Sequence, residues 1–92
     1  MQVTVEFYSG LALRLSKGKG AVVEVRDGAT LRDVSAALAL QFPAFLGQLI
    51  APGTHELVSP HLYNVNGQAA PDLGLRLHEG DRILLLSVTA GG

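Results

Sequence analysis

Alternating hydrophobic and polar positions open the chain and predict a β-strand. Val3, Val5 and Phe7 alternate with polar side chains, which is the period of a strand that buries one face. A second run rich in β-branched residues, 21–25, follows the mixed stretch 11–15 and the glycine-containing segment 16–20. We therefore predict a β-hairpin with a flexible connection, and we interpret Gly18-Lys19-Gly20 as a solvated turn because the full spacing of a phosphate-binding loop is missing.

An amphipathic helix is predicted next. Thr30 and Asp33 form a capping-box-like start, so the helix should begin at Leu31, and Pro43 should end it. Its apolar positions recur at helical spacing in a single stripe: Leu31, Val34, Ala37, Leu38 and Phe42. One stripe predicts one packed side, so this helix should cover one face of the sheet.

The segment Ala44–Pro60 is expected to be a loop with at most a short helical turn, because Pro52-Gly53 and Ser59-Pro60 interrupt its apolar residues. After it, a strand over residues 62–65 runs into Asn66-Gly67, a strong hairpin signal because both residues tolerate positive φ.

The last part of the chain supplies the end of the sheet. Leu73, Leu75 and Leu77 are expected to cover the sheet edge before a turn over residues 79–81. The run 83–86 consists of four large aliphatic residues, which is typical of a central strand. The predicted fold class is α+β, a mixed sheet of four to five strands packed on one main helix, as a single domain over residues 1–92.

Composition excludes several classes of function. The chain has 92 residues with 48% hydrophobic and 16% charged residues, enough for one core. The net charge is −1 and the seven Lys and Arg residues are scattered, so we expect no nucleic-acid and no membrane partner. We also expect a soluble, cytoplasmic protein, since no signal-like start and no apolar run of about 18 residues are present.

The sequence predicts neither a metal site nor a bound cofactor. There is no cysteine, which excludes thiolate chemistry on a side chain. His55, His61 and His78 lack the spacing of metal ligands, and we interpret them as ordinary surface histidines. No Ser/His/Asp arrangement is readable.

The chain ends in Gly91-Gly92, after a predicted strand, and we expect a flexible tail over about residues 87–92. A glycine tail has no Cβ atoms, so it can enter a narrow channel of a partner enzyme. There the carboxylate of Gly92 could be activated by ATP and its carbonyl attacked by a nucleophile. Because the chain has no cysteine, any sulfur that it carries must sit on that carboxylate.

A second candidate site lies on the last strand. If Ile83 faces the helix, then Leu84, Leu86 and Val88 face the other side of the sheet, where polar residues are usual. We expect these three residues to bind a partner. The alternative is that segment Ala44–Pro60 folds over them.

The element order and several motifs resemble the ubiquitin-like β-grasp sulfur carriers of the MoaD/ThiS family. The motifs, spread over nearly the whole chain, are Asp27-Gly28-Ala29-Thr30-Leu31, Val65-Asn66-Gly67, Gly80-Asp81 and the terminal Gly91-Gly92. The chain is most similar to MoaD-type proteins, the small subunit of molybdopterin synthase, and nearly as similar to CysO-type carriers for cysteine synthesis. MoaD-type proteins commonly have a proline pair where this chain has Ser87-Val88.

The resemblance implies a non-catalytic protein cosubstrate. A ubiquitin-activating-type (MoeB/ThiF-like) enzyme would adenylate Gly92, which would then become a thiocarboxylate, with Thr89, Ala90 and Gly91 as the tail that reaches the active site. The sulfur acceptor would be the molybdopterin synthase large subunit or a cysteine synthase. Two alternatives stay open: a ubiquitin-like modifier joined to lysines through Gly92, and a β-grasp interaction module whose Gly-Gly is incidental.

Overall fold

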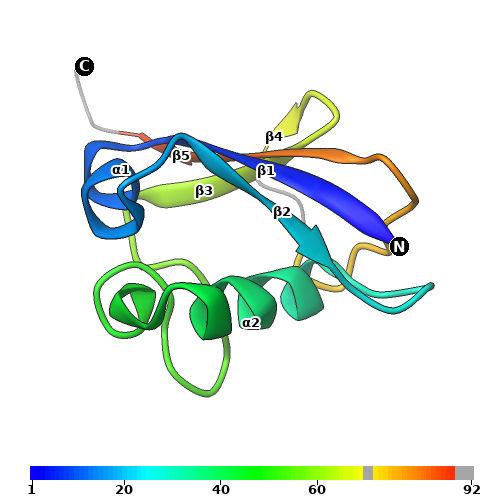
Figure 1. The fold of residues 1–92 in the computed structure, drawn as a ribbon, viewed down its shortest axis with the longest axis horizontal. Helices are drawn as coiled ribbons and strands as arrows, with labels where there is room; N and C mark the ends of the chain where they lie inside the picture. Colours follow the sequence, from blue (N-terminus) through cyan, green and yellow to red (C-terminus); the bar gives the residue numbers. More distant parts are fainter. Residues whose placement is uncertain (70–71, 89–92) are drawn as a thin grey trace.

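The chain folds around a mixed five-stranded β-sheet, and the computed structural model describes residues 1–69 and 72–88 (Figure 1). The elements of these residues are β1 (Gln2–Tyr8), α1 (Gly10–Ser16), β2 (Gly20–Glu24), α2 (Leu31–Gln41), the short 3-10 helix η1 (Pro43–Phe45), β3 (His61–Val65), β4 (Gln68–Ala69) and β5 (Arg82–Ser87). The strand order is β2-β1-β5-β3-β4; β1 and β5 are parallel and the other pairs antiparallel. The predicted α+β class, with one main helix on a mixed sheet, is confirmed. No helix in the described residues is long and apolar enough to cross a membrane.

Helix α2 begins where the capping signal predicts. The backbone N–H of Thr30 donates to Oδ2 of Asp33 at 2.9 Å, and the Thr30 hydroxyl donates to the same atom at 3.3 Å. The first helical N–H groups have no partner inside the helix. Those of Leu31 and Arg32 donate instead to the carbonyls of Leu75 and Leu73, each at 2.9 Å.

The prediction that Leu73, Leu75 and Leu77 cover the sheet edge is therefore wrong. This segment lies against the start of α2, and the N–H of Leu77 donates to the carbonyl of Ala29 at 2.9 Å. The side chain of Leu77 is buried in the core, while Leu73 and Leu75 pack against it. The backbone carbonyls of this segment accept hydrogen bonds from the first N–H groups of α2, and the leucine spacing alone does not indicate this.

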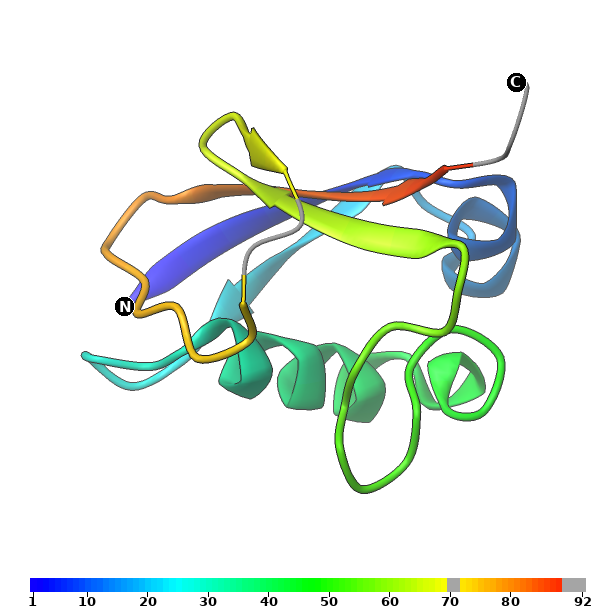
Figure 2. The same ribbon diagram turned by 180° about the vertical axis from the view of Figure 1, so that it is seen from behind.

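The hydrophobic core lies between α2 and one face of the sheet. Alternate residues of the central strands, among them Val5, Ile83 and Leu85, are fully buried against Val34 and Leu38 of α2. The segment between η1 and β3 extends on the same side of the sheet as α2 (Figures 1 and 2). Phe45 of η1 and Leu49 and Ile50 of this segment are fully buried in the same core.

The connection between β1 and β2 is the helix α1, and the prediction of a flexible connection is wrong. Ser9 caps this helix, since its Oγ accepts a hydrogen bond from the N–H of Ala12 at 3.2 Å. Ala12 is buried, and Leu11 and Leu15, one turn apart, pack against the core. Lys17 ends the helix in the left-handed conformation, at φ 58°. The side-chain cap and the spaced leucines order a segment whose glycines favour a loop.

The hairpin at Asn66-Gly67 is confirmed. Both residues have positive φ, 50° and 89°, and Val65 pairs with Gln68 across a two-residue turn. The Asn64 side chain accepts a hydrogen bond from the N–H of Gly67 at 2.9 Å, which further holds the turn. This hairpin returns the chain as the short edge strand β4.

The cap of α2 provides a test of the fold. The N–H of Thr30, and then the charge of Arg26, hold the pKa of Asp33 below its usual value. Asp33→Ala should lower the free energy of unfolding by about 1 kcal/mol at neutral pH. A lowered folded-state pKa contributes stability above the ordinary Asp pKa of about 3.9, and this contribution is lost as pH falls through the lower value. The gap between wild type and variant, measured by urea unfolding, should therefore narrow with acidification.

Glu56→Gln is the matched control for that measurement, because the Glu56 carboxylate accepts no hydrogen bond within residues 1–69 and 72–88. It should leave the free energy of unfolding nearly unchanged. A difference between wild type and Asp33→Ala that stays constant with pH would contradict the role given to the ionised cap.

Candidate functional site

The face of the sheet opposite α2 carries a row of apolar side chains across three strands. Leu86 of β5 pairs with Tyr8 of β1 on one side and with Leu62 of β3 on the other. Two residues earlier, Leu84 lies between Glu6 and Asn64 in the same way. Residues that are paired or two apart along a strand share one face.

We call five of these residues the apolar patch: Tyr8, Leu62, Leu84, Leu86 and Val88. Tyr8 is 56% exposed, Val88 49% and Leu62 36%, while Leu84 and Leu86 are half-buried. The alternative that segment Ala44–Pro60 folds over this face is wrong, since its buried residues pack on the α2 side. A contiguous group of exposed apolar side chains on one sheet face is typical of a surface that contacts a partner.

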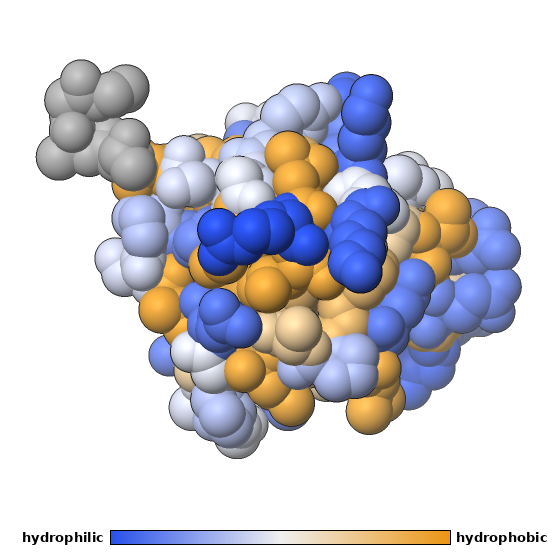
Figure 3. Space-filling view, turned by 60° about the vertical axis from the view of Figure 1, so that its left-hand side comes forward, coloured by the Kyte–Doolittle hydropathy of each residue, from blue (hydrophilic) through white to orange (hydrophobic). Residues whose placement is uncertain are grey.

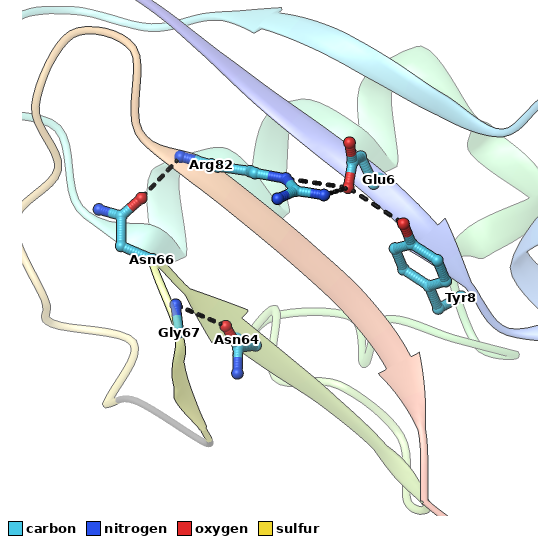
Figure 4. Close-up of polar contacts among 6 residues, drawn as sticks. All are labelled: Glu6, Tyr8, Asn64, Asn66, Gly67 and Arg82. Carbon is cyan, nitrogen blue, oxygen red and sulfur yellow. Dashed lines mark hydrogen bonds and ion pairs between the residues drawn. The ribbon is translucent and has the colours of Figure 1, made fainter.

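A polar network borders the apolar patch (Figure 4). Arg82 donates through Nε and Nη2 to Oε2 of Glu6, at 3.1 and 2.8 Å, and the hydroxyl of Tyr8 donates to the same oxygen at 3.3 Å. The hydrogen bond and charge of Arg82 hold the pKa of Glu6 below its usual value. The backbone N–H of Arg82 donates to Oδ1 of Asn66 at 3.0 Å. Strand β5 is thus fixed to both of its neighbours beside Leu84.

The end of β5 is held to β3. Ser87 pairs with His61, and the N–H of Val88 donates to the carbonyl of Pro60 at 2.8 Å. The predicted start of the tail at about residue 87 is therefore too early, because Ser87 is part of the sheet and Val88 bonds to the chain before β3. The predicted tail residues Thr89, Ala90, Gly91 and Gly92 lie outside the described residues. We refer to residues 89–92 as the tail.

His61 is buried, so the interpretation of all three histidines as surface residues is wrong for this one. It is the first residue of β3 and lies on the core side of that strand. Its Nε2 is 2.7 Å from Oγ of Ser9, and its Nδ1 is 3.1 Å from the carbonyl oxygen of Val58. A carbonyl only accepts, so Nδ1 carries the hydrogen and Nε2 accepts from the Ser9 hydroxyl.

This Ser–His pair is a buried structural contact. Ser9 is only 4% exposed and its Oγ also caps α1, so the hydroxyl has no free path to a substrate. The pair ties the start of α1 to the beginning of β3, beside the end of β5. In the described residues no group of three or more His, Asp or Glu side chains is placed to hold a metal ion.

Two members of the apolar patch, Tyr8 and Leu62, are absent from the residues predicted to bind a partner. Tyr8 looks polar in the alternating pattern of β1, and Leu62 looks like any aliphatic residue of a strand. The signal that finds them is the sheet register, because both flank Leu86. Register between strands far apart in the sequence is set by tertiary packing and cannot be counted from spacing.

A mixed sheet with parallel central strands from the two ends of the chain, packed on one helix, defines the ubiquitin-like β-grasp class. Solved structures share it. SAMP1 from Haloferax volcanii superposes with a TM-score of 0.84 at 24% identity, covering 100% of both chains. A protein assigned as molybdopterin converting factor subunit 1 from Pyrococcus furiosus gives 0.77 at 19%, covering 97% of this chain and 99% of that chain.

A chain of the BexX/CysO complex from Amycolatopsis orientalis gives a TM-score of 0.71 at 22% identity, covering 98% of this chain and 99% of its own. The model of the ThiS family matches residues 12–92. The chain therefore belongs to the ThiS family, the ThiS/MoaD-like ubiquitin-like sulfur carriers. A search of the curated proteins gives no match.

Neighbouring residues of β5 test the two faces of the sheet against each other. Leu85 is fully buried under α2, whereas Leu86 is half-buried on the open face. Leu85→Ala should lower the free energy of unfolding by about 2–5 kcal/mol, since it leaves a cavity in the core. Leu86→Ala should cost less than about 1 kcal/mol, because its surroundings are partly solvent. Chemical denaturation of both variants gives the comparison, and equal losses would mean that the open face is part of the core.

Proposed function

We propose that this protein is a sulfur carrier that is adenylated on the carboxylate of Gly92 and then converted to a thiocarboxylate. The carboxylate attacks the α-phosphorus of ATP in the site of a ubiquitin-activating-type (MoeB/ThiF-like) enzyme, and pyrophosphate leaves. Hydrosulfide (HS⁻) then attacks the carbonyl carbon of Gly92 and displaces AMP, which leaves the thiocarboxylate. Thr89, Ala90 and Gly91 are the part of the tail that passes through the channel of the partner.

The observation that carries this proposal is that the match to the ThiS family extends to residue 92, where the sequence reads Gly-Gly. Two further features support it. The chain contains no cysteine, so a carried sulfur atom has the terminal carboxylate as its acceptor. Val88, the last described residue, belongs to the apolar patch, so a partner that covers the patch also reaches the start of the tail.

The protein acts as a cosubstrate or small subunit in the cytoplasm, and its partners supply the catalytic groups. Leu84, Leu86 and Val88 dock on the activating enzyme and later on the sulfur acceptor. We propose the molybdopterin synthase large subunit as acceptor, with a cysteine synthase as the alternative. Loss of sulfur from the thiocarboxylate on mixing with one purified acceptor and its substrate, and not with the other, decides between the two pathways.

A second candidate function is protein modification, in which a target lysine attacks the activated Gly92 and forms an isopeptide bond. It is favoured by the similarity to SAMP1 from Haloferax volcanii. A second structure from that organism is described as small archaeal modifier protein 1. The activation chemistry is common to both functions. Enrichment of target peptides that carry a Gly-Gly remnant on lysine would support modification, and its absence together with thiocarboxylate formation would support the carrier.

Changes in the tail test the chemistry apart from the fold. Deletion of Gly91 and Gly92 should leave thermal stability unchanged within a few tenths of a kcal/mol, because β5 ends at Ser87. Activation should be abolished, since the carboxylate then stops two residues short, roughly 7 Å of extended backbone. Gly92→Val should be activated slowly, because a branched side chain enters a channel shaped for none. A C-terminal tag should also prevent activation.

Intact-mass spectrometry after incubation with ATP, the activating enzyme and a sulfur source follows all of these forms through the exchange of one oxygen for sulfur. Thiocarboxylate formation by the truncated chain would exclude Gly92 as the acceptor. If the native chain did not react with the adenylating enzymes of its own organism, the proposed carrier function would be contradicted.

Docking through the apolar patch is tested by charge. Leu86→Asp should weaken binding to the activating enzyme by tenfold or more, since desolvating an unpaired ion in an apolar contact costs about 1.5 kcal/mol or more. Leu40→Asp is the matched control, because Leu40 is 85% exposed on α2, away from this face. Thermal unfolding should show that both variants are folded. Titration calorimetry should show lost affinity for Leu86→Asp and unchanged affinity for Leu40→Asp. Equal affinity of the two variants for the activating enzyme would contradict the proposal that the patch is a docking surface.

A further inference from the structure

The two ends of the sheet carry opposite charge. Between Glu6 and Glu24 the sequence has no acidic residue, and this stretch contains three cations: Arg14, Lys17 and Lys19. The opposite end of the sheet carries four carboxylates, Glu24, Asp27, Glu79 and Asp81, which outnumber its two nearest cations, Arg26 and the N-terminal ammonium group. The expectation of scattered cations is therefore wrong for these three.

The three cations lie at the end of the sheet where β5 finishes. The carbonyl of Lys19 accepts a hydrogen bond from the N–H of Phe7 at 2.8 Å, and Phe7 pairs with Leu85. Lys19 is thus two strand spacings from β5, about 10 Å. Arg14 is on α1, which follows β1 directly and lies near the end of β5 (Figure 1).

These cations are available to a partner. Arg14, Lys17 and Lys19 are all exposed, and none forms an ion pair within residues 1–69 and 72–88. By contrast Arg82, on the open face, is paired with Glu6. Figure 3 brings forward the side of the molecule that carries α1, where strongly hydrophilic residues lie next to apolar ones. We call the three exposed cations the basic rim.

We propose that the basic rim docks on an acidic protein surface beside the channel that receives the tail, so that the carrier approaches its activating enzyme tail-first. This rests on the proposed function. Charges of opposite sign at the two ends of the sheet give the protein an orientation in the field of an acidic partner, although its net charge is only −1. The attracted end is the one where β5 finishes, and the repelled end carries the four carboxylates. The apolar patch then supplies the close contact.

A protein fits this rim better than a nucleic acid does. Three cations fall well short of the roughly 6–10 phosphate contacts of a typical nucleic-acid site. They also lie beside an apolar patch rather than along a continuous basic groove. An acidic cluster next to an apolar surface on a protein would match both features.

The test is a pair of charge-reversal variants with the same net charge. Lys17→Glu/Lys19→Glu and the control Arg32→Glu/Arg76→Glu each change the charge from −1 to −5, because two cations become two anions. Arg32 and Arg76 are exposed and lie by the start of α2, away from the tail end. Lys17→Arg/Lys19→Arg keeps the charge and removes the amines. Urea unfolding confirms that each variant is folded.

Adenylation is measured as ATP–pyrophosphate exchange with the purified activating enzyme of the source organism, at varied carrier and NaCl concentrations. We expect the Lys17→Glu/Lys19→Glu variant to lose about tenfold in kcat/KM at low salt, with kcat at saturating carrier unchanged and little remaining salt dependence. The arginine variant should behave as wild type. The Arg32→Glu/Arg76→Glu control should keep most of its kcat/KM.

Equal losses in the two charge-reversal variants would overturn the proposal, because net charge alone would then explain them. Wild-type kcat/KM in the lysine variant would also overturn it. Binding of a fluorescent single-stranded RNA by wild type, lost in the lysine variant, would assign the rim to nucleic acid instead. Wild-type protein without any exchange would be a failure of the proposed function, which is distinguishable from each of these results.

Discussion

The parallel pairing of β1 with β5 is the contact on which the other parts of the molecule depend. Val5 pairs with Ile83 and Phe7 with Leu85, so strands from the two ends of the chain lie side by side in the centre of the sheet. All four side chains are buried on the α2 side. The same register turns Leu84 and Leu86 to the other face. It also directs the chain past Ser87 toward the end of the sheet where α1 begins. One pairing therefore sets the core, the apolar patch and the end of the sheet at which β5 finishes.

The sequence predicts the elements whose signals are local. Alternation marks β1, an aliphatic run marks β5, Thr30 with Asp33 marks the start of α2, and Asn66-Gly67 marks the hairpin. Each of these depends on residues within a few positions of one another. The membership of Leu84, Leu86 and Val88 in one surface follows from the same alternation, once the buried face is known.

The features that sequence reasoning misses depend on distant partners. Ser9 orders α1 through its cap and through His61, 52 residues away in the chain. Leu75 lies at the start of α2 because its carbonyl accepts a hydrogen bond from the N–H of Leu31, and the leucine spacing does not indicate this contact. Tyr8 joins the apolar patch only through the register with Leu86. In the first two cases a polar group needs a hydrogen-bond partner that tertiary structure supplies, and in the third the register joins strands that are far apart in the sequence.

The long segment before β3 decides whether the open face can bind a partner. Its residues Phe45, Leu49 and Ile50 fill the core beneath the sheet, where Phe45 packs against Phe7 with ring centroids 5.7 Å apart. Burial there removes most of the segment's apolar surface from the side of Leu84 and Leu86. The segment thus stabilises the fold without covering the patch.

In the docking that we propose, the apolar patch and the basic rim act through two different physical effects. Apolar contact acts only over van der Waals distance, so Leu84, Leu86 and Val88 affect mainly the lifetime of a complex. Charge acts over about a Debye length, about 8 Å at physiological salt, so Lys17 and Lys19 affect the encounter and its orientation. Both groups adjoin the end of β5, so a partner that contacts both also contacts the last described residues before the tail. In the carrier function that we propose, a fast encounter through the basic rim keeps capture efficient even where the apolar contact is short-lived, as a protein that visits two enzymes in turn requires.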